Sequence, residues 1–145
     1  MKTKFKQAYM KTAQTFAELS HARRLQVGCI IVKDDRIISI GYNGMPAGWD
    51  NNCEHEMKWP NGEIRFLQTK DEVLHAEMNS LMKLAKSNDS GDRASMFVTH
   101  SPCLECAKGI YQAGIIEVYY QVDYRSTDGI DFLKKCGIKI EKIDK

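Results

Sequence analysis

Long apolar runs are absent from this sequence of 145 residues, and none approaches the roughly 20 residues that a membrane-spanning helix needs. A strong charge imbalance is also absent, because 21 lysines and arginines stand against 19 aspartates and glutamates, for a net charge of +2. Proteins that bind long nucleic acids usually carry a basic stripe, and none is visible here. The composition therefore argues against a membrane protein and a nucleic-acid binder. A small anionic ligand needs only one or two local cations and remains allowed.

The start of the chain lacks the apolar segment that secretion requires, since Met1 to Leu19 is basic and amphipathic. The cysteines do not form an even set for disulfides, because there are five of them. We therefore expect a reducing, intracellular and cytoplasmic setting, in which clustered cysteines more often serve metal or redox chemistry. A mitochondrial transit peptide is an alternative reading of the same start, although a packing helix explains its periodicity without cleavage.

Apolar spacing predicts that helices alternate with strands along most of the chain. The predicted helices cover residues 5–19, 71–86, 103–113 and 126–135, and the predicted strands cover 27–33, 36–42, 95–99, 115–122 and 138–143. This order is typical of an α/β fold, in which helices cover both faces of a central sheet. No repeat and no domain boundary is visible, so we expect residues 1–145 to form one domain.

Residues from about 44 to 70 interrupt this pattern with a polar segment that has no clear period. A loop of this length in a compact domain is usually functional or ordered by a ligand or partner. We expect an insertion in the same domain rather than a linker, because Trp49, Trp59, Ile64 and Phe66 are apolar side chains to be buried. The alternative is a plain surface insertion.

Two short segments carry the chemistry: His75-Ala76-Glu77 and Pro102-Cys103-Leu104-Glu105-Cys106, each at the start of a predicted helix. Cysteines at i and i+3 place both sulfurs on one side of a helical turn. The N-terminus of a helix favours thiolates. Two thiolates and one neutral imidazole suit zinc, with a fourth position left for water. We therefore predict a catalytic zinc site made by His75, Cys103 and Cys106.

Glu77 is separated from His75 by about 200° around an ideal helix, so it need not be a metal ligand. It is instead placed to face an activated water and to move protons, which is the arrangement of metal-assisted hydrolysis. A redox Cys-x-x-Cys pair and a purely structural zinc are the alternatives. The combination of His-x-Glu with Pro-Cys-x-x-Cys is more specific than its parts and is typical of zinc deaminases that act on nucleobases.

With these motifs the sequence resembles the cytidine and deoxycytidylate deaminase family, and within it the deoxycytidylate (dCMP) branch. The matching segments are 41–48, 75–79 and 98–108, and the resemblance extends over nearly the whole chain. It implies a three-layer α/β/α sandwich with a central mixed five-stranded sheet. It also implies one catalytic Zn²⁺ per subunit, with Glu77 as the proton shuttle. The implied reaction is hydrolysis of dCMP to dUMP and ammonia, which supplies dUMP for dTMP synthesis.

The resemblance also assigns residues to the substrate. Asn43 corresponds to the asparagine that contacts the sugar, although Asn in a Tyr-Asn-Gly segment also suits a turn. Ala76 would place a backbone group near the edge of the cytosine, and Ser101 would lie similarly beside the metal.

A nucleotide enzyme must also hold a 5′-phosphate, for which forked arginine donors are well suited. The local cations are Arg23, Arg24 and Arg125, and Tyr124 adds a hydroxyl. Each arginine taken singly is as easily a solvated surface residue. Tyr120 is a candidate for stacking on the base, although a tyrosine that ends a strand is more often part of the core.

Many deoxycytidylate deaminases are hexamers activated by dCTP and inhibited by dTTP with Mg²⁺. In those enzymes the Gly-Tyr-Asn-Gly segment helps to bind the effector near a subunit interface. This chain has the segment as Gly41, Tyr42, Asn43, Gly44 and Met45, so the resemblance implies a homo-oligomer with such regulation.

Some relatives carry a second zinc, and Cys53 with His55 is a candidate fragment of such a site. Val73, two residues before His75, stands where some relatives have a carboxylate, which argues for a single zinc. Three other functions stay open on the same fold: a deaminase of tRNA or another nucleic acid, a deaminase of free nucleosides, and a non-catalytic nucleotide sensor. The sensor would lack the proton shuttle, whereas Glu77 is present.

Overall fold

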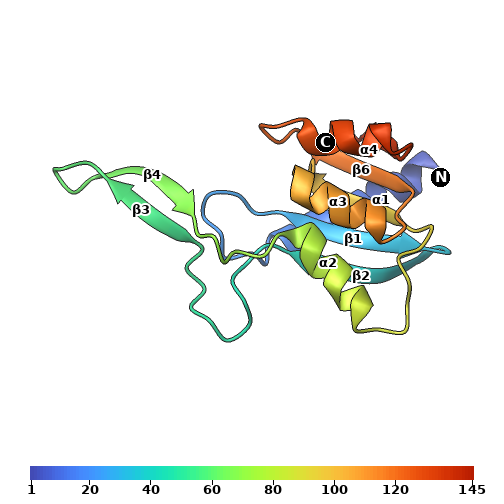
Figure 1. Cartoon of the computed structure of the whole chain (residues 1–145), viewed down its shortest axis with the longest axis horizontal. Coiled ribbons are helices and arrows are strands. Elements are labelled where there is room, and N and C mark those ends of the chain that lie inside the picture. Colours follow the sequence, from blue (N-terminus) through green and yellow to red (C-terminus); the bar gives the residue numbers. More distant parts are fainter.

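A computed structural model describes all residues from 1 to 145, and its centre is a mixed five-stranded sheet (Figure 1). The strand order is β2 (Arg36–Tyr42), β1 (Gly28–Lys33), β5 (Ser95–His100), β6 (Glu117–Val122) and β7 (Lys139–Lys142). Strand β1 runs antiparallel to both of its neighbours, while β5, β6 and β7 are parallel. The predicted α/β class and mixed sheet are thus confirmed.

Four helices cover the sheet: α1 (Thr3–Ala17), α2 (Ala76–Ala85), α3 (Leu104–Gln112) and α4 (Asp128–Lys135). Helix α1 packs on one face, where Met10 and Ala13 join Phe97 and Tyr119 in a core cluster of seven buried residues. Helices α2, α3 and α4 cover the other face over a cluster of 13 (Figure 1). The result is the expected three-layer arrangement. None of the four helices has the length and apolar content needed to cross a membrane.

The polar segment after β2 differs from its prediction, because it contains two strands. Strands β3 (Glu54–Lys58) and β4 (Ile64–Thr69) pair antiparallel as a hairpin that projects from the body (Figure 1). Its turn contains Asn61 and Gly62, and Gly62 adopts a φ of +91° that favours glycine. The Asn-Gly pair is a sequence feature typical of such a hairpin turn. Strand β3 itself was not predicted, because its charged sequence has no alternation of apolar and polar residues.

The prediction that this segment buries its large apolar side chains is wrong for the single chain. Trp49, Trp59, Ile64 and Phe66 are each about half exposed, between 48% and 55%. For Trp59, Ile64 and Phe66 the reason is geometric, because the two-stranded hairpin that carries them leaves the body and has nothing to pack against; Trp49 lies in the turn before the hairpin. The Arg65 guanidinium covers part of this surface, 4.7 Å from the centre of the Trp59 ring.

Candidate active site

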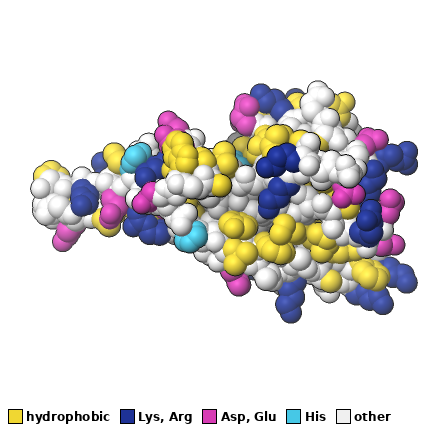
Figure 2. All heavy atoms as spheres, turned by 90° about the horizontal axis from the view of Figure 1, so that it is seen from below, with side chains coloured by type: hydrophobic (Ala, Val, Ile, Leu, Met, Phe, Trp, Pro, Cys, Tyr) yellow, Lys and Arg dark blue, Asp and Glu magenta, His cyan; other side chains and the backbone are white.

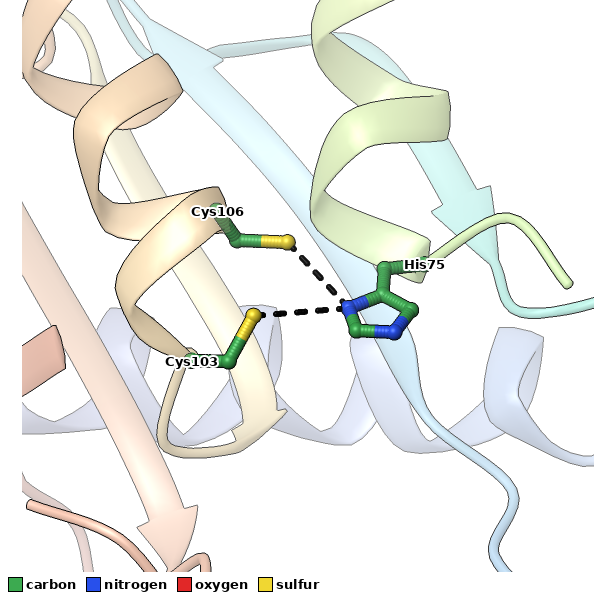
Figure 3. Close-up of side chains that lie close together, drawn as sticks. All are labelled: His75, Cys103 and Cys106. Carbon is green, nitrogen blue, oxygen red and sulfur yellow. Dashed lines mark hydrogen bonds between the residues drawn. The ribbon is translucent and has the colours of Figure 1, made fainter. Parts of the chain in front are cut away.

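The His75-Ala76-Glu77 segment and the Pro102–Cys106 segment meet at one edge of the sheet. Because β1 is antiparallel to both β2 and β5, the carboxyl ends of β2, β5 and β6 lie on the same side. His75 is the N-cap residue of α2, and Cys103, three residues after the end of β5, is the N-cap residue of α3. Figure 3 shows both helix starts facing each other. This is the edge at which α/β sheets commonly bind ligands.

Helix α2 starts at Ala76, five residues later than predicted, because the preceding residues are held extended. Gly44 and Leu74 form an isolated bridge in which each backbone N–H donates to the other carbonyl, at 3.1 and 2.8 Å. The Asn79 side chain donates to the Tyr42 carbonyl at 2.8 Å. Gly41 lies so close to the helix that an added Cβ would be 2.5 Å from the Ala76 carbonyl oxygen. These contacts set the direction in which His75 leaves the backbone.

His75, Cys103 and Cys106 form a tight group of metal-ligand atoms. Nδ1 of His75 lies 3.3 Å from the Cys106 sulfur and 3.6 Å from the Cys103 sulfur, and all three atoms lie within 4.8 Å of one another (Figure 3). Hydrogen bonds from Cys106 and His75 lower the pKa of the Cys103 thiol to about 4. The hydrogen bond to Cys103 in turn raises the pKa of His75. The group therefore favours an anionic sulfur.

This donor set fits zinc. Tetrahedral zinc with bonds of roughly 2.0–2.3 Å keeps its ligand atoms about 3.5–4 Å apart. The two measured sulfur-to-nitrogen distances are close to that spacing, and sulfur with imidazole nitrogen is a ligand combination typical of zinc. Three protein ligands leave one position open, as a catalytic site requires.

Glu77 lies beside this group and is not one of its members. Its side chain is buried, with the residue 4% exposed, and it lines the same pocket as His75 and Cys103. Burial raises the pKa of Glu77 to about 7. A carboxyl group with a pKa near neutrality can both accept and release a proton, which suits a proton shuttle.

The pocket above the group has a volume of about 250 Å³, and several residues singled out in the sequence line it. They are Asn43, Ser101, Tyr124 and Arg125. The Asn43 side chain accepts from the Val27 N–H at 2.9 Å and donates to the Leu25 carbonyl at 2.8 Å. It therefore shapes the turn. One amide hydrogen and one lone pair remain for a ligand.

Other singled-out residues do not line the pocket. Arg23 is directed to Glu54, with Nε 3.6 Å from a carboxylate oxygen. Tyr120 is half-buried and packs against the larger core cluster, and Ala76 is fully buried below the site. Arg24, in contrast, lines the pocket. The structure thus separates two adjacent arginines that the sequence could not distinguish.

Comparison with known proteins agrees with this geometry. The protein-family model described as the cytidine and deoxycytidylate deaminase zinc-binding region matches residues 3–122 of the chain. The chain belongs to the cytidine and deoxycytidylate deaminase family.

Among members of this deaminase family, the deoxycytidylate deaminase of Enterobacteria phage T4 is 33% identical over 154 residues, covering 83% of this chain and 80% of that protein. The human deoxycytidylate deaminase is 39% identical over 123 residues, covering 83% of this chain and 66% of that protein. The crystal structure of the dCMP deaminase of cyanophage S-TIM5 in complex with dCMP and dUMP is 46% identical, with a TM-score of 0.87 and 99% of both chains covered.

Sequence reasoning missed two polar residues of the pocket, Thr69 and His100. His100 ends β5 just before the Ser101-Pro102-Cys103 segment, so its position next to a metal-binding motif of the family was an available signal. Thr69 belongs to the unpredicted hairpin and had no such signal. Cys53 also lines the pocket, but Cys53 and His55 belong to no group of three metal-ligating side chains.

A second hollow, of about 600 Å³, lies on the other side of the Gly41–Met45 segment. Tyr42, Asn43, Gly44 and Met45 line it, and Lys83 and Lys86 of α2 add two cations. Asn43 is the one residue that lines both hollows. The segment that the deaminase family resemblance connects with effectors therefore reaches, through Asn43, the pocket that Glu77 lines.

Proposed function

We propose that this chain hydrolyses dCMP to dUMP and ammonia. The observation that carries the proposal is the pocket in which His75, Cys103 and buried Glu77 lie together with two arginines. The similarity to deaminases named for deoxycytidylate, and to a structure solved with dCMP and dUMP, supports the same substrate. A balanced net charge of +2 does not favour a nucleic-acid substrate.

His75, Cys103 and Cys106 would hold Zn²⁺, one ion per chain. When bound, zinc supplies Lewis acidity that activates a water molecule for attack on C4 of cytosine. The Glu77 carboxylate accepts a proton from that water and delivers it to ring N3. It then transfers the second water proton to the departing amino group, which leaves as ammonia. Water and dCMP are consumed, dUMP and ammonia are formed, and Glu77 returns to its starting state.

The remaining pocket residues would bind and orient the nucleotide. Asn43 would use its free amide hydrogen and lone pair on the sugar, and Ser101 would lie beside the base. Ser101 is itself oriented, because its hydroxyl oxygen accepts the Tyr124 N–H at 2.7 Å. Arg24 and Arg125 would hold the 5′-phosphate, with Tyr124 adding a hydroxyl.

We expect purified, zinc-containing protein to release ammonia from dCMP faster than from CMP or deoxycytidine. The sugar and phosphate contacts are the reason, because a bound charged group contributes on the order of 1.5–3 kcal/mol, or tenfold to a hundredfold in specificity. Equal release from deoxycytidine would indicate a nucleoside deaminase. No release from any of the three, with zinc bound, would indicate a nucleic-acid substrate or a sensor.

The same assay with dCTP and Mg²⁺, or with dTTP and Mg²⁺, tests the regulatory part of the proposal. The hollow beside Gly41–Met45, with Lys83 and Lys86 as cations, is of a size and charge that suit a nucleotide triphosphate. Its occupant would act on the pocket through Asn43 and the Gly44–Leu74 bridge next to His75. We expect dCTP to activate the wild-type protein. We expect Lys83→Gln to abolish this activation and to leave the basal rate of the enzyme unchanged. Rates unaffected by either nucleotide would contradict this part alone.

We also propose that the chain is a homo-oligomer, with the hexamer of the family resemblance as the expected state and the segment from about 44 to 70 as a functional part of the same domain. The half-exposed Trp59 and Phe66 support it, because an isolated two-stranded hairpin is marginally stable in water, and the half-exposed Trp49 before the hairpin adds to the exposed apolar surface. Figure 2 shows further hydrophobic side chains on the face of the body beside the hairpin.

Sedimentation velocity should therefore give a mass six times the 16.6 kDa of one chain. Phe66→Ser, which removes an exposed apolar side chain from β4, should shift the mass to smaller species. Gln68→Ser lies on the same strand two residues away and is the matched control, with no shift expected. A wild-type protein that sediments as a single chain would refute the oligomer.

A further inference from the structure

One carboxylate at the base of the hairpin is buried, although the rest of its strand is exposed. Glu54 begins β3 and is only 1% exposed, whereas the four residues that follow it in the strand are all exposed. A buried charge costs free energy unless it is paired and hydrogen-bonded. Its position therefore requires partners, and those partners come from the loop before β1.

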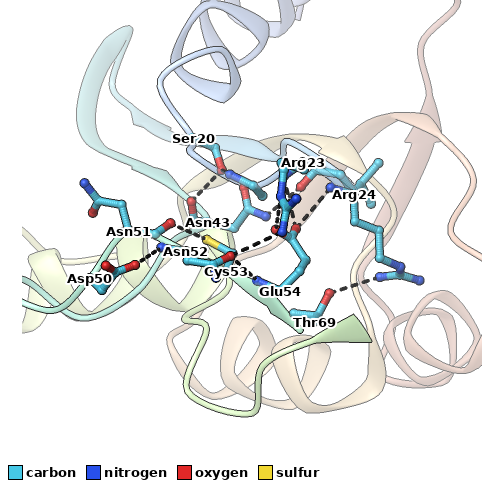
Figure 4. Close-up of polar contacts among 12 residues, drawn as sticks. Ser20, Arg23, Arg24, Asn43, Asp50, Asn51, Asn52, Cys53, Glu54 and Thr69 are labelled. Carbon is cyan, nitrogen blue, oxygen red and sulfur yellow. Dashed lines mark hydrogen bonds and ion pairs between the residues drawn. The ribbon is translucent and has the colours of Figure 1, made fainter. Parts of the chain in front are cut away.

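The Glu54 carboxylate binds two consecutive residues of that loop. Its Oε2 accepts the backbone N–H groups of Arg23 and Arg24, each at 3.0 Å. Its Oε1 has no hydrogen-bond partner, and the Arg23 Nε lies 3.6 Å away. The carboxylate thus fixes the backbone of both arginines and draws the Arg23 side chain onto itself (Figure 4).

The Arg24 side chain is held separately, from the other strand of the hairpin. Its Nη1 donates to Thr69 Oγ1 at 3.3 Å, and both Arg24 and Thr69 line the pocket. Thr69 is the cross-strand partner of Glu54 in the β3–β4 register. A single residue pair at the base of the hairpin therefore holds the backbone of Arg24 on one side and its guanidinium on the other (Figure 4).

We propose that Glu54 is a positioning residue that, with Thr69, holds Arg24 for the 5′-phosphate of the substrate; this rests on the proposed nucleotide deaminase activity. Arg23 neutralises Glu54, so the charge of Arg24 stays available to the ligand. The hairpin base then acts as a specificity device that favours nucleotides over nucleosides, while the metal-ligand group and Glu77 carry the chemistry.

Steady-state kinetics on the full zinc-containing chain test this inference with two substrates. Arg24→Gln should raise KM for dCMP on the order of tenfold to a hundredfold and change kcat little, because a charged hydrogen bond to phosphate is lost. Glu54→Gln keeps one carbonyl acceptor and the side-chain shape, and should raise KM for dCMP about tenfold. Both variants should leave kcat/KM for deoxycytidine unchanged, since it has no phosphate. Glu56→Gln, exposed on the same strand, is the matched control with no effect.

The double variant supplies the decisive result. If Glu54 acts through Arg24, adding Glu54→Gln to Arg24→Gln should raise KM for dCMP no further. Thr69→Val, which replaces the hydroxyl group with a methyl group of similar size, should reproduce part of the rise in KM. Equal losses on dCMP and deoxycytidine, or additive effects in the double variant, would show that Glu54 serves only the fold and would overturn the inference. Failure of wild-type protein to deaminate dCMP would instead overturn the proposed function on which it rests.

Discussion

Glu77→Gln is expected to abolish turnover while zinc stays bound. The substitution keeps the size of the side chain and removes its ability to accept and release a proton. A positioned general acid–base group contributes about 10²- to 10⁴-fold to a rate, and Glu77 serves both proton transfers of the proposed reaction. Because Glu77 is not part of the metal-ligand group, the zinc content should remain that of the wild type.

The measurement combines ammonia release from dCMP with zinc determination on the same preparation. Glu63→Gln, an exposed residue at the tip of the hairpin, makes the same chemical change away from the pocket and should retain the wild-type rate. A Glu77→Gln protein that deaminates dCMP at a normal rate would show that another group moves the protons. Loss of both zinc and rate would show that Glu77 has a role in holding the metal.

Cys106→Ser is expected to remove bound zinc and, with it, activity. Cys106 is 2% exposed, and its sulfur lies 3.3 Å from the His75 nitrogen, so it is the most enclosed member of the ligand group. Even outer-shell partners of metal ligands cost about 10–100-fold in affinity or activity when replaced, and loss of a direct ligand should exceed this range. Wild-type protein should carry about one zinc per chain, whereas Cys106→Ser should carry far less.

Elemental analysis after gel filtration measures the metal, and ammonia release measures the activity. Cys136→Ser is the control, because Cys136 is a half-buried cysteine at the C-terminal end of α4 and belongs to no metal-ligand group. Chelation should inactivate the wild type, and added Zn²⁺ should restore it. A Cys106→Ser protein with full zinc and full rate would contradict the assignment of the ligand group.

The ligand group was predictable because its information is local. Cys103 and Cys106 are three residues apart at the start of α3, and His75 precedes α2 directly. Helical geometry relates the two cysteines without knowledge of the rest of the chain, and the His-x-Glu motif singles out His75 as their partner. The order of strands and helices in the sheet followed from apolar spacing for a similar reason, since each element records its own periodicity.

The hairpin and the exposure of its aromatic residues were not predictable in the same way. Strand β3 contains Glu54, Glu56 and Lys58, a pattern without an apolar face, and only pairing with β4 makes it a strand. Burial of Trp59 and Phe66 was expected from their apolar character. Their exposure depends on the position of the hairpin relative to the body, and no local sequence pattern predicts that position.

By itself, then, the amino-acid sequence determined the fold class and singled out His75, Cys103, Cys106 and Glu77 as candidates for the site. Spacing within single helices and strands, together with the His-x-Glu and Pro-Cys-x-x-Cys motifs, carries that information. The tertiary structure decided which arginine enters the pocket, because the Arg23 side chain is directed to Glu54 and the Arg24 side chain to Thr69, both distant along the chain. It also decided that Asn43, in the Gly41–Met45 segment, lines two hollows at once. Such long-range contacts depend on how the whole chain packs, and the local sequence carries no record of them.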